Sequence, residues 1–173
     1  MHDTAYNNTE RFYDDYCADL SAGSIVVDFG SYSVNGSVRN IFEPHLKYIG
    51  IDQFAGPNVD IACENRKTPF ENKSIDVVIS ISCFEHDKFF WMTFLEMCRV
   101  VKPGGFIYIN APSGGPYHGH PGDCWRFYKD SWKALEEWAV ENGFPVSLIE
   151  TYIDERNIFP NWCDSVGIFK LDT

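Results

Sequence analysis

The feature that most constrains the fold is a short apolar run that ends in a carboxylate and a glycine. Ile25, Val26 and Val27 are consecutive and β-branched, a pattern typical of a strand buried on both faces. Asp28 closes the run, and Gly30 lets the backbone turn sharply into a segment whose free N–H groups face the turn. An ordinary connection in any α/β protein gives a similar pattern. Together, however, strand, acid, glycine turn and helix start predict a cradle for a nucleotide-like ligand at the carboxyl edge of a parallel sheet.

Apolar segments alternate with helical patterns along the rest of the chain. Besides 25–28, we predict strands at 47–52, 59–62, 75–80, 106–110, 146–153 and 166–171, and helices at 10–20, 36–42, 89–101 and 130–142. This alternation favours an α/β fold of three layers around a mostly parallel, seven-stranded sheet. The last two strands have no helix between them, so we expect an antiparallel edge. With 173 residues and no repeat or linker, the chain is expected to form one domain over 1–173.

The N-terminal segment, residues 1–23, is polar and aromatic. Thr9 is placed to cap a helix that begins near Glu10, and Phe12, Tyr16 and Leu20 recur at helical spacing. One interpretation is a helix packed on the edge of the sheet. The other is a helical lid whose tyrosines contact the ligand.

Charge and cysteine content limit the partners. The chain has 14 basic and 25 acidic residues, a net charge of −11, and no basic run, which argues against nucleic acid and against an anionic membrane surface. The six cysteines form no Cys-x-x-Cys pair that would indicate zinc or redox chemistry. No signal peptide opens the chain, and no apolar stretch approaches the ~20 residues of a membrane span, so we expect a cytoplasmic protein without a membrane partner. The oligomeric state is left open.

Carboxylates also follow the second and third predicted strands. Asp52 ends the second strand, where a carboxylate can accept both hydroxyls of a ribose, although a solvated strand-end acid would look the same. Glu64 comes just after the third strand and could accept from an adenine amino group, with the Asn65 N–H completing contact with the base edge.

These segments together resemble the class I S-adenosylmethionine-dependent methyltransferases, and most closely the small branch called methyltransferase type 11. The motifs that carry the resemblance are Val27–Gly30, Gly50–Asp52, Thr68–Phe70, Ile75–Val78, Phe84–His86 and Val101–Gly105. The resemblance implies a three-layer Rossmann-like methyltransferase fold, S-adenosylmethionine as the cofactor, and methyl transfer to a small polar acceptor. The acceptor it favours is a sugar or glycolipid precursor, methylated on oxygen or nitrogen.

The resemblance also implies the cofactor-binding residues. They are Asp28, Gly30, Ser31, Tyr32, Asn35, Asp52, Gln53, Glu64, Asn65 and Ser80. The chain departs from the family where Tyr32 and Val34 replace two glycines of the first turn, so we expect a differently bowed loop with hydrogen bonds from Ser31, Ser33 and Asn35. This departure favours one alternative function, a non-catalytic protein that binds S-adenosylmethionine. A nucleotide-binding oxidoreductase is a weaker alternative, because its Gly-x-Gly-x-x-Gly is absent.

The segment 111–129 follows the fifth predicted strand, where the family builds its acceptor pocket. Histidines, an acid, an arginine and aromatic residues in one loop suit the recognition and deprotonation of a polar acceptor. The candidate bases are His118 and His120, and the candidate substrate-binding residues are Tyr117, Asp123, Trp125 and Arg126. The alternative is that Trp125 and Phe127 anchor the loop in the core and the histidines lie on the surface. His-x-His with a nearby acid would also permit a metal, but no further ligand is placed by the sequence, so none is expected. His86 is a separate candidate that could equally pack or position the cofactor.

Overall fold

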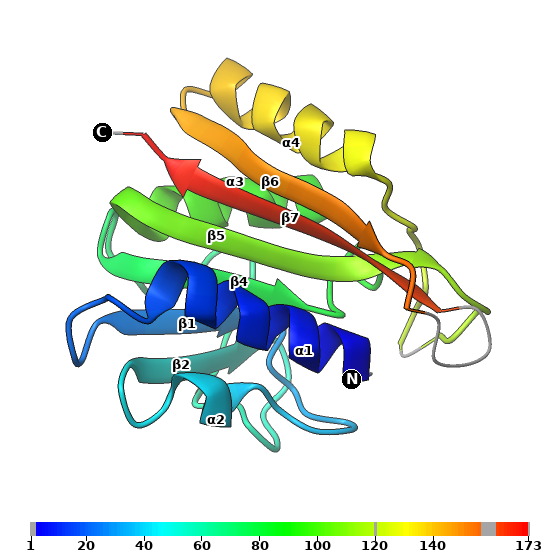
Figure 1. The fold of residues 1–173 in the computed structure, drawn as a ribbon, viewed down its shortest axis with the longest axis horizontal. Helices are drawn as coiled ribbons and strands as arrows, with labels where there is room; N and C mark the ends of the chain where they lie inside the picture. Colours follow the sequence, from blue (N-terminus) through cyan, green and yellow to red (C-terminus); the bar gives the residue numbers. More distant parts are fainter. Residues whose placement is uncertain (1–2, 120, 157–161, 173) are drawn as a thin grey trace.

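A seven-stranded sheet with helices on both faces forms the structure, a computed structural model that describes residues 3–119, 121–156 and 162–172 (Figure 1). The helical elements are α1 (Asp3–Phe12), continued by a π-helix (Tyr13–Cys17), α2 (Arg39–Phe42), α3 (Phe90–Val100) and α4 (Lys129–Glu141). The strands are β1 (Ile25–Phe29), β2 (Lys47–Asp52), β3 (Ile61–Ala62), β4 (Ile75–Ile81), β5 (Val101–Gly114), β6 (Val146–Asp154) and β7 (Cys163–Leu171). Among the described residues, no helix has the length and apolar character needed to cross a bilayer.

The strand order is β3-β2-β1-β4-β5-β7-β6. β1 pairs in parallel with both β2 and β4. After β1 the chain forms β2 and β3 on one side of β1, and then crosses to form β4 on the other side. β7 pairs antiparallel with β5 and with β6, which confirms the expected antiparallel edge. The carboxyl ends of β1, β2 and β4 therefore meet at a topological switch point, which is where open α/β sheets bind their ligands.

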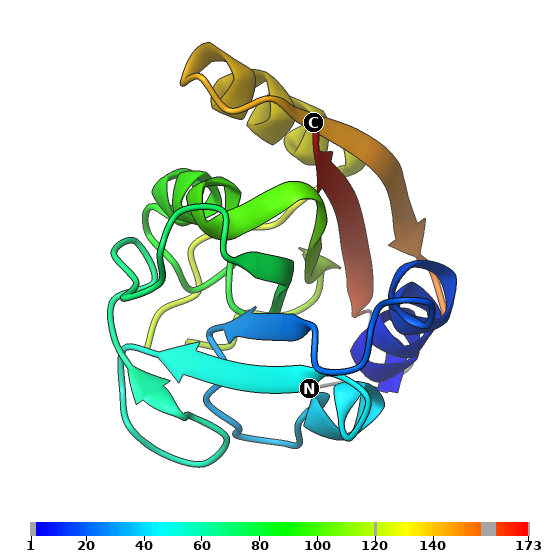
Figure 2. The same cartoon turned by 90° about the vertical axis from the view of Figure 1, so that its left-hand side faces the viewer.

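Helices cover both faces of the sheet (Figure 2), and alternate residues of the central strands belong to two separate core clusters. On one face Val27 and Val78 pack with Phe94 of α3 and Trp132 of α4. On the other face a second cluster contains α1, α2 and the intervening strand positions, among them Ala5, Phe12, Val26, Phe42, Val77 and Tyr108. Burial on both faces explains why the β-branched runs of β1 and β4 predict strands so clearly.

The N-terminal helix differs from its prediction. It begins at Asp3 and not near Glu10, and Thr9 is a buried residue in its interior, whose hydroxyl donates to the Ala5 carbonyl at 2.8 Å. Phe12 stacks on Tyr108 of β5 with ring centroids 4.6 Å apart, and Arg11 lies over the ring of Tyr152 in the edge strand β6, so the helix covers the sheet from β5 to this edge. The capping pattern at Thr9 was overridden because Ala5 and Phe12 together make an apolar face that only an earlier helix start can bury.

β5 is longer than predicted at both ends. Residues 102–105 form an irregularity between the pairs Ile75–Val101 and Val77–Phe106, where Gly104 has φ 79°. At the other end, residues 111–114 continue the strand because they pair with the start of β7. The loop predicted over 111–129 is therefore shorter, and its free part begins after Gly114.

Candidate functional site

A cavity of about 1170 Å³ opens at the carboxyl ends of β1, β2 and β4. Its walls come from the turn after β1, the end of β2, the segment 64–66, the segment after β4 and the loop after β5. The predicted site residues that line it are Asp28, Gly30, Ser31, Tyr32, Asn35, Asp52, Gln53, Glu64, Asn65 and His118. The structure thus brings most of the predicted cofactor residues and one candidate base to one space.

The turn after β1 requires a glycine at position 30. Gly30 has φ +85°, and a Cβ there would lie 2.2 Å from Cys83 Sγ. The Gly30 and Ser31 N–H groups both donate to the Ile51 carbonyl at 2.9 Å, which holds the turn against β2. Tyr32, in place of a family glycine, packs its ring on Gly56, where a Cβ would come within 2.2 Å of the ring. The loop after β1 is therefore packed closely against Gly56 through the Tyr32 ring.

Asp28 lies at the floor of the cavity and is 5% exposed. Its Oδ2 accepts from the Tyr48 hydroxyl, whereas its Oδ1 is buried without a hydrogen-bond partner among the described residues. Burial raises the pKa of Asp28 to about 7. An unpartnered carboxylate oxygen in this position suits a ligand that carries a positive group, as the ammonium and sulfonium of S-adenosylmethionine do.

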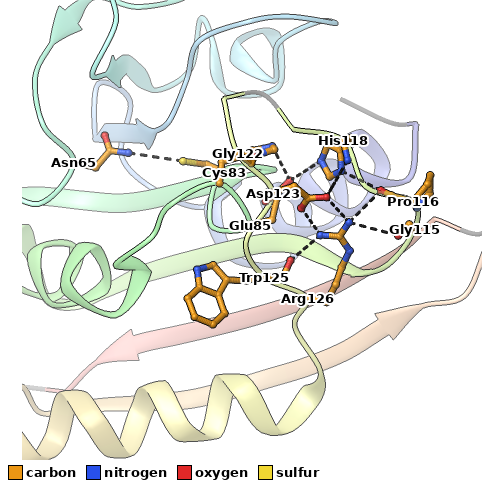
Figure 3. A network of polar contacts seen from close by, with 11 residues as sticks. Asn65, Cys83, Glu85, Gly115, Pro116, His118, Gly122, Asp123, Trp125 and Arg126 are labelled. Atoms are coloured by element: carbon orange, nitrogen blue, oxygen red, sulfur yellow. Dashed lines mark hydrogen bonds and ion pairs between the residues drawn. The ribbon is translucent and has the colours of Figure 1, made fainter.

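The residues predicted to bind the ribose and adenine of this ligand also face the cavity. Asp52 faces the cavity and accepts from the backbone N–H of Phe54 at 2.9 Å and of Tyr32 at 3.4 Å, which leaves lone pairs for further donors. Asn65 Oδ1 is buried without a partner among the described residues, and its amide donates to Cys83 Sγ at 3.8 Å (Figure 3). Glu64 is exposed at the rim. These groups fit a nucleoside.

A second group of polar side chains gathers beyond the end of β4. Glu85 is 1% exposed, and its Oε1 lies 3.6 Å from His86 Nε2 and 3.8 Å from His118 Nε2. Its Oε2 is buried without a hydrogen-bond partner among the described residues. The two imidazole rings meet edge to face with centroids 4.9 Å apart. All three residues line the cavity, so this cluster forms its polar end away from Asp52.

Asp123 and Arg126 hold His118 in this cluster (Figure 3). Asp123 Oδ2 accepts from the His118 backbone N–H at 2.9 Å and lies 3.2 Å from His118 Nδ1. The Arg126 guanidinium grips both Asp123 oxygens and donates to the Pro116 carbonyl at 3.1 Å. This guanidinium holds the pKa of Asp123 well below its usual range. The pKa of His118 is raised, mainly by its interaction with Glu85 and also by the negative charge of Asp123. Neither Asp123 nor Arg126 lines the cavity; their hydrogen bonds are within the loop, and the Arg126 guanidinium also lies over the Trp162 ring.

Other predicted residues lie outside the cavity lining. Tyr117 is 78% exposed, and Trp125 packs on Phe90 while its indole N–H donates to the Asp87 carbonyl at 3.0 Å. Ser80 is 1% exposed and donates to the Phe29 carbonyl, beneath the floor. These contacts show that Trp125 anchors the loop and that the Ser80 hydroxyl is occupied by the protein. His120 lies outside the described residues.

The N-terminal segment contributes no described residue to the cavity lining. Tyr6 accepts a hydrogen bond from Asn40, and the Tyr16 hydroxyl donates to Glu150 of β6 at 2.8 Å. The lid over 1–23 therefore stays a prediction, and these two tyrosines are engaged with the protein.

Sequence reasoning gave no site role to several lining residues, among them Glu85, Trp162 and Asp164. Glu85 entered only as part of a family motif, although its place four residues after the buried strand β4 was a usable signal. Trp162, which comes just before β7, and Asp164, its second residue, also line the cavity. No local pattern marks them, since the antiparallel pairing of β7 with β5 brings them there.

Comparison with known proteins assigns the chain to a family. A family model described as a methyltransferase domain matches residues 16–109, more than half of the chain. An uncharacterized methyltransferase of Mycobacterium leprae (strain TN) is 26% identical over 171 residues, which cover 84% of this chain and 60% of that protein. The chain spans 44 to 60% of the length of the first curated relatives it matches.

Solved structures share the fold. The YcgJ protein from Bacillus subtilis superposes with a TM-score of 0.67 at 13% identity and covers 99% of both chains. The 1,6-didemethyltoxoflavin-N1-methyltransferase of Burkholderia thailandensis, bound to 1,6-didemethyltoxoflavin and S-adenosylhomocysteine, gives a TM-score of 0.73 at 13% identity, covering 98% of this chain and 79% of that one. The match to the methyltransferase domain supports S-adenosylmethionine as the cofactor of this chain. The chain belongs to the class I S-adenosylmethionine-dependent methyltransferases, in the methyltransferase domain family that its motifs resemble.

Proposed function

We propose that this methyltransferase modifies a small polar acceptor bound between the cofactor and the cluster of Glu85, His86 and His118. The observation that carries the proposal is the buried, unpartnered Oε2 of Glu85, which lines the same cavity as Asp28 and Asp52. An unpaired buried carboxylate oxygen is costly, and a donor on a bound acceptor would remove that cost. Hydroxyl and amine groups are such donors.

Positioning is the main task of the chain's residues in this proposal. When bound, S-adenosylmethionine supplies a methyl group that its sulfonium already makes electrophilic. Holding an acceptor atom in line with that methyl can lower the barrier by ~7–11 kcal/mol. Glu85 would orient the acceptor, while Asp28 and Asp52 would hold the cofactor end of the cavity.

A hydroxyl acceptor also needs a base, and His118 is the residue that we assign. Its Nδ1 faces the Asp123 carboxylate at 3.2 Å, which leaves Nε2, 3.8 Å from Glu85 Oε1, to take the hydroxyl proton. Such a base contributes ~10²–10⁴-fold to the rate. His120, the other base predicted from the sequence, remains a second candidate in the same loop.

The acceptor class follows from the charge of the cavity and of the chain. A polar end with a carboxylate and two imidazoles suits a polyhydroxyl or amino compound, and a net charge of −11 disfavours a nucleic-acid substrate. A sugar or glycolipid precursor, methylated on oxygen or nitrogen, is the acceptor that we propose to test first. We propose a cytoplasmic location for this activity.

Cofactor binding is the first test. S-adenosylhomocysteine at about 100 times its dissociation constant should stabilise the fold by ~2.7 kcal/mol, whereas NAD should not, because the glycine pattern of a dinucleotide site is absent. Thermal unfolding with each compound measures this. An equal response to both compounds, or none to either, would overturn the cofactor-binding part of the proposal.

Turnover on a panel of sugars and amines, followed by mass spectrometry of the product, is the second test. Replacing His118 and His120 together by Ala should lower kcat by ~10²–10⁴-fold while leaving the affinity for S-adenosylhomocysteine within a few fold. His45→Ala is the matched control, since His45 lies outside the cavity lining and contacts the Leu20 carbonyl. Normal turnover of the double variant on a hydroxyl acceptor would rule both histidines out as the base.

A further inference from the structure

Three side chains that could ligate a metal converge at the polar end of the cavity. One ligand atom each from Glu85, His86 and His118 lies within 4.8 Å of the other two. Glu85 and His86 follow β4, and His118 comes from the loop after β5, so two neighbouring parallel strands deliver them to one place. The sequence predicted no metal because it placed only His118, His120 and Asp123 together.

The spacing is close to that of an occupied site. In a tetrahedral zinc site with bonds of about 2.0–2.2 Å, neighbouring ligand atoms lie about 3.3–3.6 Å apart. Glu85 Oε1 is 3.6 Å from His86 Nε2 and 3.8 Å from His118 Nε2, so these two edges are already near that range. The distance between the ligand nitrogens of the two histidines must shorten for an ion to bind. The His118 side chain is 34% exposed, which leaves its ring room to rotate.

The hydrogen bonds behind both rings set their tautomers. His86 Nδ1 contacts the Gly122 carbonyl, which can only accept, so Nδ1 carries the proton. His118 Nδ1 likewise faces Asp123 Oδ2 at 3.2 Å and the Pro116 carbonyl at 3.4 Å. In the neutral rings, both Nε2 atoms therefore present lone pairs toward Glu85. A histidine that ligates a metal characteristically donates its other ring N–H to a carbonyl or carboxylate in this way.

Two lone pairs and a carboxylate that face one another call for a positive charge between them. A single proton on one ring satisfies one edge of the triangle and leaves the lone pair of the other imidazole facing the Glu85 carboxylate. We propose that Glu85, His86 and His118 bind one divalent transition-metal ion, for which Zn²⁺ is the best match. One carboxylate and two imidazoles with an open position form the ligand set of catalytic zinc sites.

The open position would face the cavity. A hydroxyl acceptor bound there would have its pKa lowered by the ion, and its proton would leave to solvent at the cavity mouth. His118 Nε2 can hold either the ion or a proton, so in the metal-bound protein the ion would activate the hydroxyl as a Lewis acid, water would accept the proton, and His118 would no longer serve as the base. This consequence rests on the proposed function, whereas binding of the ion does not.

Metal binding can be measured without turnover. The purified chain is treated with EDTA, dialysed, and titrated with Zn²⁺ by calorimetry and with Co²⁺ by visible absorption. We expect one ion per chain and the intense Co²⁺ absorption of a four-coordinate nitrogen and oxygen site. We expect no comparable binding of Mg²⁺, which prefers oxygen ligands in octahedral geometry.

Variants locate the ion. Glu85→Gln and His118→Ala should each abolish the Co²⁺ spectrum, and Asp123→Asn, which loosens the support behind His118, should weaken affinity by about 10- to 100-fold. His45→Ala should bind as the unaltered chain does. If Glu85→Gln does not fold, the partly exposed His118 still carries the test, with S-adenosylhomocysteine binding as the measure of an intact fold.

The outcomes separate this proposal from the proposed function. If Zn²⁺ and Co²⁺ fail to bind while S-adenosylhomocysteine binds, the metal site is overturned and the methyltransferase assignment stands. Binding that persists in Glu85→Gln and His118→Ala, or a Co²⁺ spectrum dominated by thiolate charge transfer, would place the ion elsewhere and also overturn it. Metal binding without S-adenosylhomocysteine binding would support the site and count against the proposed function.

Discussion

Replacing Gly30 by Ala tests whether the turn after β1 is as tightly constrained as its geometry indicates. Gly30 has φ +85°, where a residue with a Cβ pays ~1–2 kcal/mol. The new Cβ would also lie 2.2 Å from Cys83 Sγ and 2.6 Å from Cys83 Cβ, and overpacking of this kind costs ~1–3 kcal/mol. We therefore expect Gly30→Ala to lower the free energy of unfolding by ~2–5 kcal/mol, or the Tm by roughly 4–20 °C.

Gly23 supplies a matched control for this variant. It has φ +84°, and a Cβ there would have no atom within 4 Å, so Gly23→Ala should cost only the backbone part, ~1–2 kcal/mol. Adding Cys83→Ala to Gly30→Ala removes the nearer clashing atom and should recover part of the loss in a double-mutant cycle. Urea denaturation followed by circular dichroism measures the unaltered chain, the single variants Gly30→Ala, Cys83→Ala and Gly23→Ala, and the double variant. An equal cost for Gly30→Ala and Gly23→Ala would refute the claim that Cys83 crowds the turn.

Three further predictions concern binding and pH. Asp52→Ala should weaken S-adenosylhomocysteine binding roughly 10- to 150-fold, because charge-assisted hydrogen bonds of ~1.5–3 kcal/mol are lost, and unchanged affinity by calorimetry would show that the ribose is held elsewhere. The pKa of Asp28 is 3.8 in the unfolded chain and is raised to about 7 in the folded protein. The stability that protonated Asp28 contributes is therefore complete below the unfolded pKa and is lost as the pH rises through the folded pKa. Urea melts of the ligand-free chain should therefore show that Asp28→Asn gains stability relative to the unaltered chain between about pH 4 and about pH 8, whereas parallel pH profiles would contradict the shift. Arg126→Ala removes the support of Asp123 behind His118 and should lower kcat more than it lowers cofactor affinity; equal losses in both would show that Arg126 acts on the whole fold.

Local sequence patterns predicted the boundaries of several helices and strands. The strand over Lys47–Asp52 begins and ends as predicted, and α3 and α4 differ from their predicted ranges by one residue at each end. These elements are predictable because each buries a continuous apolar run or stripe, and that demand is written within a few consecutive residues. The acids at the ends of β1 and β2 follow from the same patterns, so the side of the cavity that contains Asp28 and Asp52 could be anticipated.

Elsewhere, tertiary packing decided. Thr9 carries the pattern of a helix cap yet lies inside α1, because Ala5 and Phe12 reach the sheet only if the helix starts earlier. The 111–114 segment is strand and not loop because β7 pairs with it. In both cases a contact distant in sequence outweighs a local preference, since the burial gained exceeds the few tenths of a kcal/mol to ~2 kcal/mol that capping or propensity supplies.

The polar end of the cavity is the clearest case. The sequence named His118 and Asp123, but it could not bring Glu85 and His86 to them, nor Trp162 and Asp164 from the chain around the start of β7. Glu85 and His118 are neighbours because β4 and β5 are adjacent parallel strands whose carboxyl ends meet at one edge. Strand order is settled by the packing of whole helices on the sheet, and no short stretch of sequence contains that information.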